Sequence, residues 1–257
     1  MPIVDRLSLL RGAVSRDPQR RYESRYSLLS AVAGRLGHRL YNSNLTWVDD
    51  ADYTAAWGAF PAARPEIKDR KFVLWSFAKA TANLSGDTAE CGVFDGGSSF
   101  LMCLARANEP GWSGLHHLFD SFEGLSEPSA TDVPSHEHTY RWKKHDLAVS
   151  EAVVLRNLEE FQFVRSHPGW IPTRFEEVAQ RRFSFVHVDV DLYEPTRDSL
   201  EFFYERLVPG GVLLCDDYGS SACPGATKAF DEYISSRPER SVIHLPTGQG
   251  FIVKRPA

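Results

Sequence analysis

One stretch of the sequence decides the fold, and it reads TAECGVFDGGSS from Thr88 to Ser99. Residues 88–94 are typical of a short β-strand that runs into glycines, and residues 97–107 are typical of a helix. Glycines at such a junction let the backbone turn sharply and come close to a ligand. A strand, a glycine-rich turn and a helix in this order predict the first unit of an α/β sheet with a ligand site at the turn.

Strand patterns and helix patterns continue to alternate on the C-terminal side of this stretch. We expect strands at 88–94, 115–119, 161–164, 183–190 and 212–215, and a closing hairpin from 241–245 and 251–253. We expect helices at 66–84, 97–107, 151–158, 172–179, 196–207 and 224–235. The alternation predicts a mostly parallel sheet with helices on both faces, which binds its ligands at the carboxyl ends of the strands.

The chain length, net charge and hydrophobic pattern limit the classes of protein to consider. The chain has 257 residues, and residues 1–65 lack the regular alternation and end at Pro61 and Pro65. We therefore expect a helical N-terminal extension over residues 1–65, acting as a lid, and the main domain over residues 66–257. The net charge of -5 gives no general attraction to nucleic acid or to an anionic membrane. No apolar stretch approaches roughly 18 residues, so we expect no membrane span and a cytoplasmic location.

The chain has four cysteines, and none of them forms a C-x-x-C pair. They are Cys91, Cys103, Cys215 and Cys223. Three of them stand in apolar runs, so we interpret all four as reduced packing residues without a disulfide.

Two features near the first strands favour a nucleoside ligand. The glycine spacing around Gly92 and Gly96 is G-x-x-x-G-G, which differs from the G-x-G-x-x-G of dinucleotide sites and disfavours NAD. Glu90 and a wide glycine turn suit a ligand with an amino-acid tail and no phosphate. Asp120 ends the second strand, where Rossmann-like folds use a carboxylate to bind ribose hydroxyls. The alternatives are a plain tight turn and an Asp120 that caps the next helix.

Four carboxylates follow two later strands of the predicted sheet. They are Asp189 and Asp191 in HVDVDLY, and Asp216 and Asp217 in CDDYG. Neighbouring strands lie about 4.8 Å apart, so these negative charges would repel one another and raise some of their pKa values. A bound divalent cation would relieve the repulsion, and oxygen ligands suit magnesium, manganese or calcium better than zinc. The alternative is that two of the aspartates cap helices and two are exposed.

The histidines have simpler expected roles. His187 lies within an apolar strand, where a hydrogen-bonded core histidine is favoured over a catalytic one. His116 and His117 should point to opposite faces of their strand. We expect the polar stretch 126–145 to be a loop over the site.

Aromatic side chains occur in both segments that could cover the site. Trp47 belongs to the extension, and Tyr140 and Trp142 belong to the loop 126–145. They could stack on a sugar or a polyketide, or simply pack against the protein.

Taken together, these motifs resemble the macrocin O-methyltransferase family. The motifs are ExGVxxGGS at 90–98, DSFEGL at 120–125, HVDVDLYEPT at 187–196, PGGV with DDYG at 209–219, and CPGA at 223–226. They occur in this order, and the resemblance covers residues 72–253. Members of the family methylate hydroxyl groups of natural products, often on deoxysugars of antibiotics, and are often dimers or larger.

The resemblance implies a Rossmann-like class I methyltransferase sheet that uses S-adenosylmethionine and Mg²⁺. The residues that it implies for the cofactor site are Glu90, Gly92, Val93, Gly96, Ser98, Asp120 and Ser121, with Asp120 on the ribose. It implies Asp189, Asp216 and Asp217 as metal ligands, and it implies catalytic roles for Asp189 and for Asp191 as general base. Some relatives use a histidine near this place, but Leu192 and Tyr193 follow here, so Asp191 fits better.

The expected reaction is an in-line attack of an acceptor hydroxyl on the sulfonium methyl group. A sugar of a secondary metabolite is the expected acceptor, and a surface-polysaccharide sugar or a phenol is the alternative. We expect no nucleic-acid or membrane partner, and a homo-oligomer. A magnesium-dependent phosphohydrolase is the rival from another class, because Asp189-x-Asp191 follows an apolar strand. A non-catalytic protein that keeps the fold is a further alternative.

Overall fold

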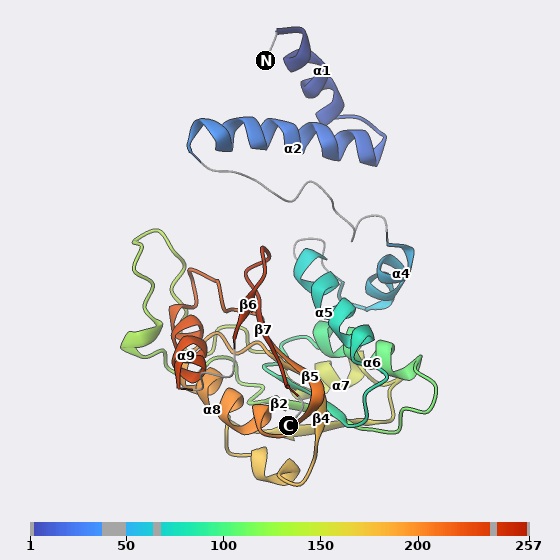
Figure 1. Cartoon of the computed structure of the whole chain (residues 1–257), viewed down its shortest axis with the longest axis vertical. Helices are drawn as coiled ribbons and strands as arrows, with labels where there is room; N and C mark the ends of the chain where they lie inside the picture. The colour runs from blue at the N-terminus through green and yellow to red at the C-terminus, as the bar shows by residue number, and fades with distance from the viewer. Residues whose placement is uncertain (1–2, 38–49, 64–67, 237–240, 256–257) are drawn as a thin grey trace. The chain divides into compact units, whose positions relative to one another are not determined.

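The computed structural model describes residues 3–37, 50–63, 68–236 and 241–255 (Figure 1). Trp47 lies outside these residues. The chain forms two compact units, residues 1–49 and residues 50–257. The smaller unit contains the helices α1 (Ile3–Ala13) and α2 (Pro18–Arg35). The predicted extension is therefore helical, although the units divide after residue 49 and not after residue 65.

Helix α4 (Ala51–Ala59) belongs to the larger unit because its aromatic residues pack there. The Tyr53 ring contacts the Phe72 ring edge-on at 5.2 Å between centroids, and the Phe60 ring lies 5.5 Å from the Phe100 ring. Tyr53 and Phe60 are each at most 2% exposed. Their burial gives α4 its place beside the sheet.

The larger unit is built on a seven-stranded sheet with the order β3-β2-β1-β4-β5-β7-β6. The strands are β1 (Asp87–Cys91), β2 (His116–Asp120), β3 (Val164–Pro168), β4 (Phe183–Val188), β5 (Leu207–Cys215), β6 (Ile243–His244) and β7 (Gly250–Val253). Strands β1 to β5 are parallel, and β7 is antiparallel to β5 and β6. The expected mostly parallel sheet and its closing hairpin are confirmed. Strand order reverses between β1 and β4, which is where such sheets bind ligands.

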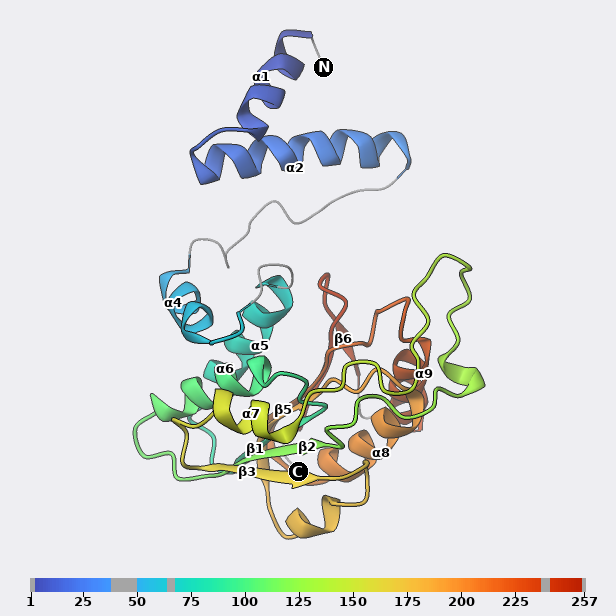
Figure 2. The same ribbon diagram turned by 180° about the vertical axis from the view of Figure 1, so that it is seen from behind.

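Helices cover both faces of the sheet (Figures 1 and 2). They are α5 (Lys68–Ala80), α6 (Gly97–Ala107), α7 (Glu151–Asn157), α8 (Tyr193–Tyr204) and α9 (Pro224–Ser235), with the 3₁₀ helices η1 (Ala130–Asp132) and η2 (Phe175–Val178). On one face, Phe77 of α5 packs against Phe185 and Phe251. On the other face, Phe203 of α8 and Phe230 of α9 are fully buried in the main hydrophobic core.

Several elements depart from their predicted positions, among them β5, which starts at Leu207 and not at Val212. Strand β3 starts at Val164 and not at Phe161, because the backbone from Leu158 to Val164 forms turns whose amides bond to carbonyls three residues earlier. The segment 172–179 forms the short 3₁₀ helix η2 in place of a full helix. Helix α8 starts at Tyr193, three residues earlier than predicted, so it follows almost directly after Asp191.

All four cysteines are free and buried, as predicted. Burial raises the pKa of each thiol, so all four resist ionisation. Among the described helices, none has both the length and the apolar character needed to cross a bilayer.

Candidate active site

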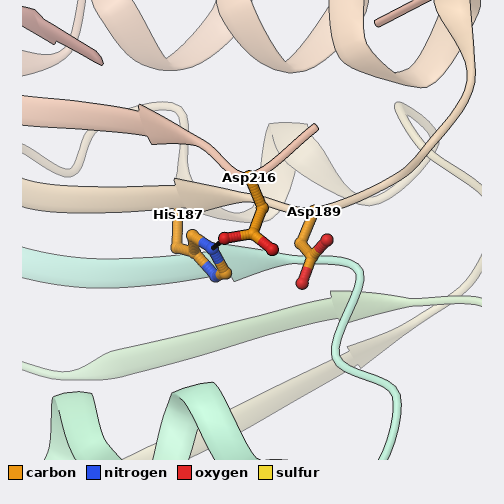
Figure 3. A group of neighbouring side chains, drawn as sticks. All are labelled: His187, Asp189 and Asp216. Atoms are coloured by element: carbon orange, nitrogen blue, oxygen red, sulfur yellow. Dashed lines mark hydrogen bonds and ion pairs between the residues drawn. The ribbon is translucent and has the colours of Figure 1, made fainter. Parts of the chain in front are cut away.

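The carboxyl ends of three parallel strands bring the predicted acids to one edge of the sheet. Strand register sets Glu90 of β1 beside His187 of β4, and Val188 beside Cys215 of β5. The Asp189 amide then donates to the Cys91 carbonyl at 2.8 Å, which fixes the first residue after β4. Figure 3 shows Asp189 and Asp216 leaving the ends of these strands, with Asp216 bonded to His187.

Gly92 explains how closely β1 and β4 approach at this edge. Its φ is 79°, in the left-handed region that favours glycine. A Cβ atom on residue 92 would lie only 1.9 Å from the Asp189 carbonyl oxygen. The glycine of this motif therefore permits the contact that positions Asp189.

The acids form two groups. Possible ligand atoms of His187, Asp189 and Asp216 all lie within 4.8 Å of one another, and so do those of Asp191, Asp217 and Cys223. The structure thus brings two of the predicted metal ligands together, Asp189 and Asp216. It places the third, Asp217, beside the predicted general base.

His187 is fully buried and connects Glu90 of β1 to Asp216, which follows β5. Its Nδ1 lies 2.9 Å from Glu90 Oε1, and its Nε2 lies 3.3 Å from Asp216 Oδ1. Burial alone would lower the pKa of His187, but the hydrogen bonds to Asp216 and Glu90 raise it to about 10. The ring is therefore a cation that donates to both carboxylates. The expected core histidine is confirmed, and its link to the two acids is an addition that sequence spacing did not reveal.

Two further partners of Asp216 were missed because no motif contains them. The Arg70 guanidinium pairs with the Asp216 carboxylate and donates to Asp217 Oδ1 at 3.3 Å. Gln249 Nε2 donates to Asp216 Oδ1 at 2.6 Å. Arg70 comes from the first turn of α5 and Gln249 precedes β7, so only the folded chain brings them to the strand ends.

The four aspartates of the site differ in how their surroundings shift their pKa values. Burial and mutual repulsion raise the pKa values of Asp189 and Asp217, and they raise the pKa of Asp191 to about 7. Burial would also raise the pKa of Asp216, but the His187 hydrogen bond and the Arg70 charge lower it. The four aspartates and Glu90 carry five carboxylates, against the cations His187, Arg70 and Lys71. The carboxylates therefore outnumber the cations, and a bound divalent cation would reduce this imbalance.

Asp191 stands in a constrained turn. Its φ is 58°, which is unusual for a residue with a side chain. Its amide donates to Asp217 Oδ2 at 3.2 Å, and the Cys223 thiol donates to Asp191 Oδ1 at 3.4 Å. Trp142 Nε1 donates in turn to Cys223 Sγ at 3.3 Å. The predicted loop 126–145 therefore reaches the acids through Trp142, while Tyr140 is 56% exposed.

The residues predicted for the cofactor lie at the ends of β1 and β2. Glu90 is 1% exposed and accepts from Ser99 on one oxygen and from His187 on the other. Asp120 accepts from the Val93 amide at 2.6 Å and from the Phe122 amide at 2.7 Å, which joins the two loops after these strands.

The remaining cofactor residues belong to these same loops. The Ser98 hydroxyl accepts from Lys71 Nζ, and the Ser121 hydroxyl donates to the Gly124 carbonyl at 3.0 Å. Gly96, with a φ of 87°, is the N-cap residue of α6. The glycine turn thus leads directly into the helix, as predicted.

A second polar network lies on the opposite face of β1 and β2. His117 Nε2 lies 3.0 Å from Asp87 Oδ2, and His117 Nδ1 lies 3.0 Å from His167 Nε2. His167 Nδ1 lies 2.6 Å from Glu177 Oε2. His116 faces the other way and bonds to Thr88 and Ser99. The predicted opposite orientations of His116 and His117 are confirmed, and both rings have partners.

A cavity of about 590 Å³ lies among α4, α5 and α6. Alanines and Trp75 form much of its wall, and it contains none of the predicted site residues. The predicted site residues lie instead at the strand ends.

With this geometry established, comparison with known proteins identifies the family. Residues 77–240 match the family described as macrocin-O-methyltransferase (TylF). The chain belongs to this family. The match includes the glycine turn and every aspartate of the two acidic groups.

Two relatives have names that state their acceptors. One is the 8-demethyl-8-(2,3-dimethoxy-alpha-L-rhamnosyl)-tetracenomycin-C 4'-O-methyltransferase of Streptomyces olivaceus, 35% identical over 56% of this chain and 58% of the relative. The other is the demethyldecarbamoylnovobiocin O-methyltransferase of Streptomyces niveus, 31% identical over 59% of each chain. The matched region is thus less than two thirds of each relative's length.

Solved structures of other methyltransferases share the fold. The O-methyltransferase NovP is 26% identical, with a TM-score of 0.59 over 73% of this chain and 80% of its own. The calicheamicin methyltransferase CalS11 is 15% identical, with a TM-score of 0.65 over 93% of this chain and 94% of its own. The predicted Rossmann-like methyltransferase fold is confirmed.

Proposed function

We propose that this protein transfers a methyl group from S-adenosylmethionine to a sugar hydroxyl of a secondary metabolite, with Mg²⁺ bound among its aspartates. One observation carries the proposal: Asp189, Asp191, Asp216 and Asp217 gather at the switch point of the sheet in a chain of this family. The rhamnosyl group in the name of one relative's substrate supports a sugar acceptor.

The donor set fits magnesium. Carboxylate oxygens are the ligands that Mg²⁺ prefers, and carboxylates outnumber cations at this edge of the sheet. Asp189 and Asp216, which lie in one group, would hold it, and Asp217 would join them from the neighbouring group. The group around Asp191 contains the Cys223 thiol, whose raised pKa keeps it protonated and makes it a poor ligand. Bound magnesium would supply a positive charge that lowers the pKa of the acceptor hydroxyl.

Asp191 is the residue that would take the proton from the acceptor. Its pKa of about 7 lies near neutral pH, where a general base is most effective. The Asp217 carboxylate and the Cys223 thiol hold its backbone and side chain in place. At 7% exposure, Asp191 is shielded from bulk water, which strengthens its interactions with an acceptor.

Asp120 and the glycine turn would position the cofactor, which supplies the electrophilic methyl group. Asp120 already holds the loops after β1 and β2 through the Val93 and Phe122 amides. Ribose hydroxyls would add to these bonds at the carboxyl end of β2. Glu90, which accepts from Ser99 and from His187, would line the same site at the end of β1.

The test begins with calorimetric titration of the protein with S-adenosylhomocysteine, with and without Mg²⁺. Labelled S-adenosylmethionine is then offered with the demethyl substrates of the two relatives, a simple phenol and a polysaccharide sugar. We expect micromolar binding and methylation of a glycosylated natural product. Folded protein that binds no S-adenosylhomocysteine would overturn the proposal, and Mg²⁺-dependent hydrolysis of p-nitrophenyl phosphate would favour the phosphohydrolase.

A matched pair of variants tests the base. Asp191→Asn should reduce turnover by about 10²- to 10⁴-fold and leave S-adenosylhomocysteine binding intact. Asp198→Asn on α8, which removes the negative charge that pairs with Arg197, should keep nearly full turnover. Equal activity of the two variants would remove Asp191 from the base role.

A further inference from the structure

Helix α8 begins without a cap from its own segment. Its N-cap residue, Leu192, makes no side-chain capping bond. The first amides of a helix have no partner within the helix and need acceptors from elsewhere. Here the Tyr193 amide donates to Asp132 Oδ1 at 2.7 Å. Asp132 belongs to η1 in the loop 126–145, so a distant segment supplies the cap.

Asp132 is built firmly into this position. It is 5% exposed, and its Oδ2 accepts from the Ser129 amide at 2.8 Å and the Ser129 hydroxyl at 2.7 Å. A Cβ atom on Gly225 of α9 would lie 1.9 Å from Asp132 Oδ1. The carboxylate therefore occupies a notch that exists because residue 225 is glycine.

The turn that Asp132 holds is the one that carries Asp191. A left-handed residue with a side chain costs on the order of 1 kcal/mol or more and persists only where its surroundings hold it. Asp217 accepts from the amide of Asp191 on one side, and Asp132 accepts from the amide of Tyr193 on the other. The two bonds fix both ends of a three-residue turn.

We propose that Asp132 is a positioning residue for methyl transfer, because it fixes the turn that aims Asp191 and ties that turn to the loop 126–145. The same loop reaches Asp191 a second time through Trp142 and Cys223. Asp132 belongs to neither acidic group that could bind a metal. The inference rests on the proposed function, in which Asp191 takes the proton of the acceptor.

The kinetic test compares Asp132→Ala and Asp132→Asn with a matched cap elsewhere. Asp50 caps α4 through a bond of the same length, 2.7 Å to the Tyr53 amide, so Asp50→Ala is the control. We expect Asp132→Ala to lower kcat by about 10- to 30-fold, and Asp132→Asn by less, with both KM values within about twofold. Asp50→Ala should lose similar thermal stability and keep its kcat.

Hydrogen exchange provides a readout that needs no acceptor. In Asp132→Ala, the amides of residues 191–194 should exchange at least about tenfold faster, while those of β4 and the dissociation constant of S-adenosylhomocysteine stay unchanged. Unchanged exchange at 191–194, or a kcat like that of wild type in a destabilised variant, would overturn the inference and leave Asp132 as an ordinary cap. Wild-type protein that methylates no acceptor would count against the proposed function, and the exchange result would still decide whether Asp132 positions the turn.

Discussion

The two polar networks of the sheet differ in how their charges are balanced. Between β1, β2 and β3, the rings of His117 and His167 stand in line between Asp87 and Glu177. These three contacts give all four ring nitrogens of the two histidines a partner. Arg181 lies 3.5 Å from Asp87, and Arg174 also pairs with Glu177. This network satisfies its own charges.

The network at the carboxyl ends of the strands, by contrast, does not balance its own charges. His187 and Arg70 compensate Asp216, and Arg70 also contacts Asp217. Even so, Asp189, Asp191 and Asp217 are buried carboxylates with raised pKa values. Uncompensated buried charge is costly, and in proteins it is commonly retained at functional sites. The comparison teaches that a completed polar network stabilises the sheet, whereas an incomplete one indicates where a ligand binds.

Removing Asp216, the centre of the network at the strand ends, should reduce activity more than any other change. Asp216→Ala deletes the acid that His187, Arg70 and Gln249 all contact, together with a proposed metal ligand. We expect Mg²⁺-dependent methyl transfer to fall on the order of 10³-fold, with S-adenosylhomocysteine binding largely kept. Initial rates and calorimetry measure the two quantities, and normal turnover would disprove the metal role.

Breaking the completed network should instead reduce stability. Asp87 is 5% exposed and accepts from His117 and from the Leu115 amide. Asp87→Ala should lower the free energy of unfolding by about 3 kcal/mol in urea titrations, because it leaves buried donors unpaired. Glu177→Gln, at the exposed end of the line, serves as the milder control. If Asp87→Ala abolished catalysis without loss of stability, the contrast between the networks would be wrong.

Magnesium should stabilise the protein through one network alone. At about 100 times its dissociation constant, a ligand of the folded state adds about 2.7 kcal/mol. We expect EDTA to remove this gain in wild type and in Asp87→Ala. Asp216→Ala should be stabilised little by Mg²⁺, so EDTA should change its stability little. Thermal unfolding with and without Mg²⁺ measures the stabilisation. Equal stabilisation of all three proteins would contradict the prediction.

The smallest expected effect is a loss of folding stability at acidic pH. Burial lowers the pKa of His167. Burial would raise the pKa of Asp87, but the hydrogen bonds from His117 and the Leu115 amide, together with the nearby Arg181 charge, lower it. The unfolded chain therefore takes up protons before the folded one as the pH falls below about 6.5 for histidine and about 4 for aspartate. Stability should decline over this range, by at most about 1.4 kcal/mol per pH unit for each proton. In His167→Gln the decline between pH 6.5 and 5 should be shallower, and an unchanged slope in urea titrations would assign the acid sensitivity elsewhere.

The sequence predicts the acidic edge because the physics there is local. Asp189 and Asp216 follow apolar strands, and parallel strands end at the same edge of a sheet. The division of the acids into two groups was not predictable, because it depends on the left-handed backbone of Asp191. Arg70 was missed because its side chain reaches Asp217 across 147 positions of the chain.

The histidine network was missed for a different reason. The predicted third strand ended at residue 164, so His167 had no assigned strand position, and Asp87 preceded the predicted start of the first strand. In the structure, β3 runs from Val164 to Pro168 and sets His167 beside Phe119 of β2. An error of a few residues in a strand boundary therefore hides which side chains face one another.

The buried, protonated state of the four native thiols makes the protein a convenient subject for site-specific labelling. Maleimides and spin labels react with thiolates, which these cysteines form only with difficulty. A cysteine introduced at the exposed position 140, as Tyr140→Cys, would react in preference to them. Spectroscopy of a probe at that position could then follow the loop 126–145 as acceptors arrive and leave.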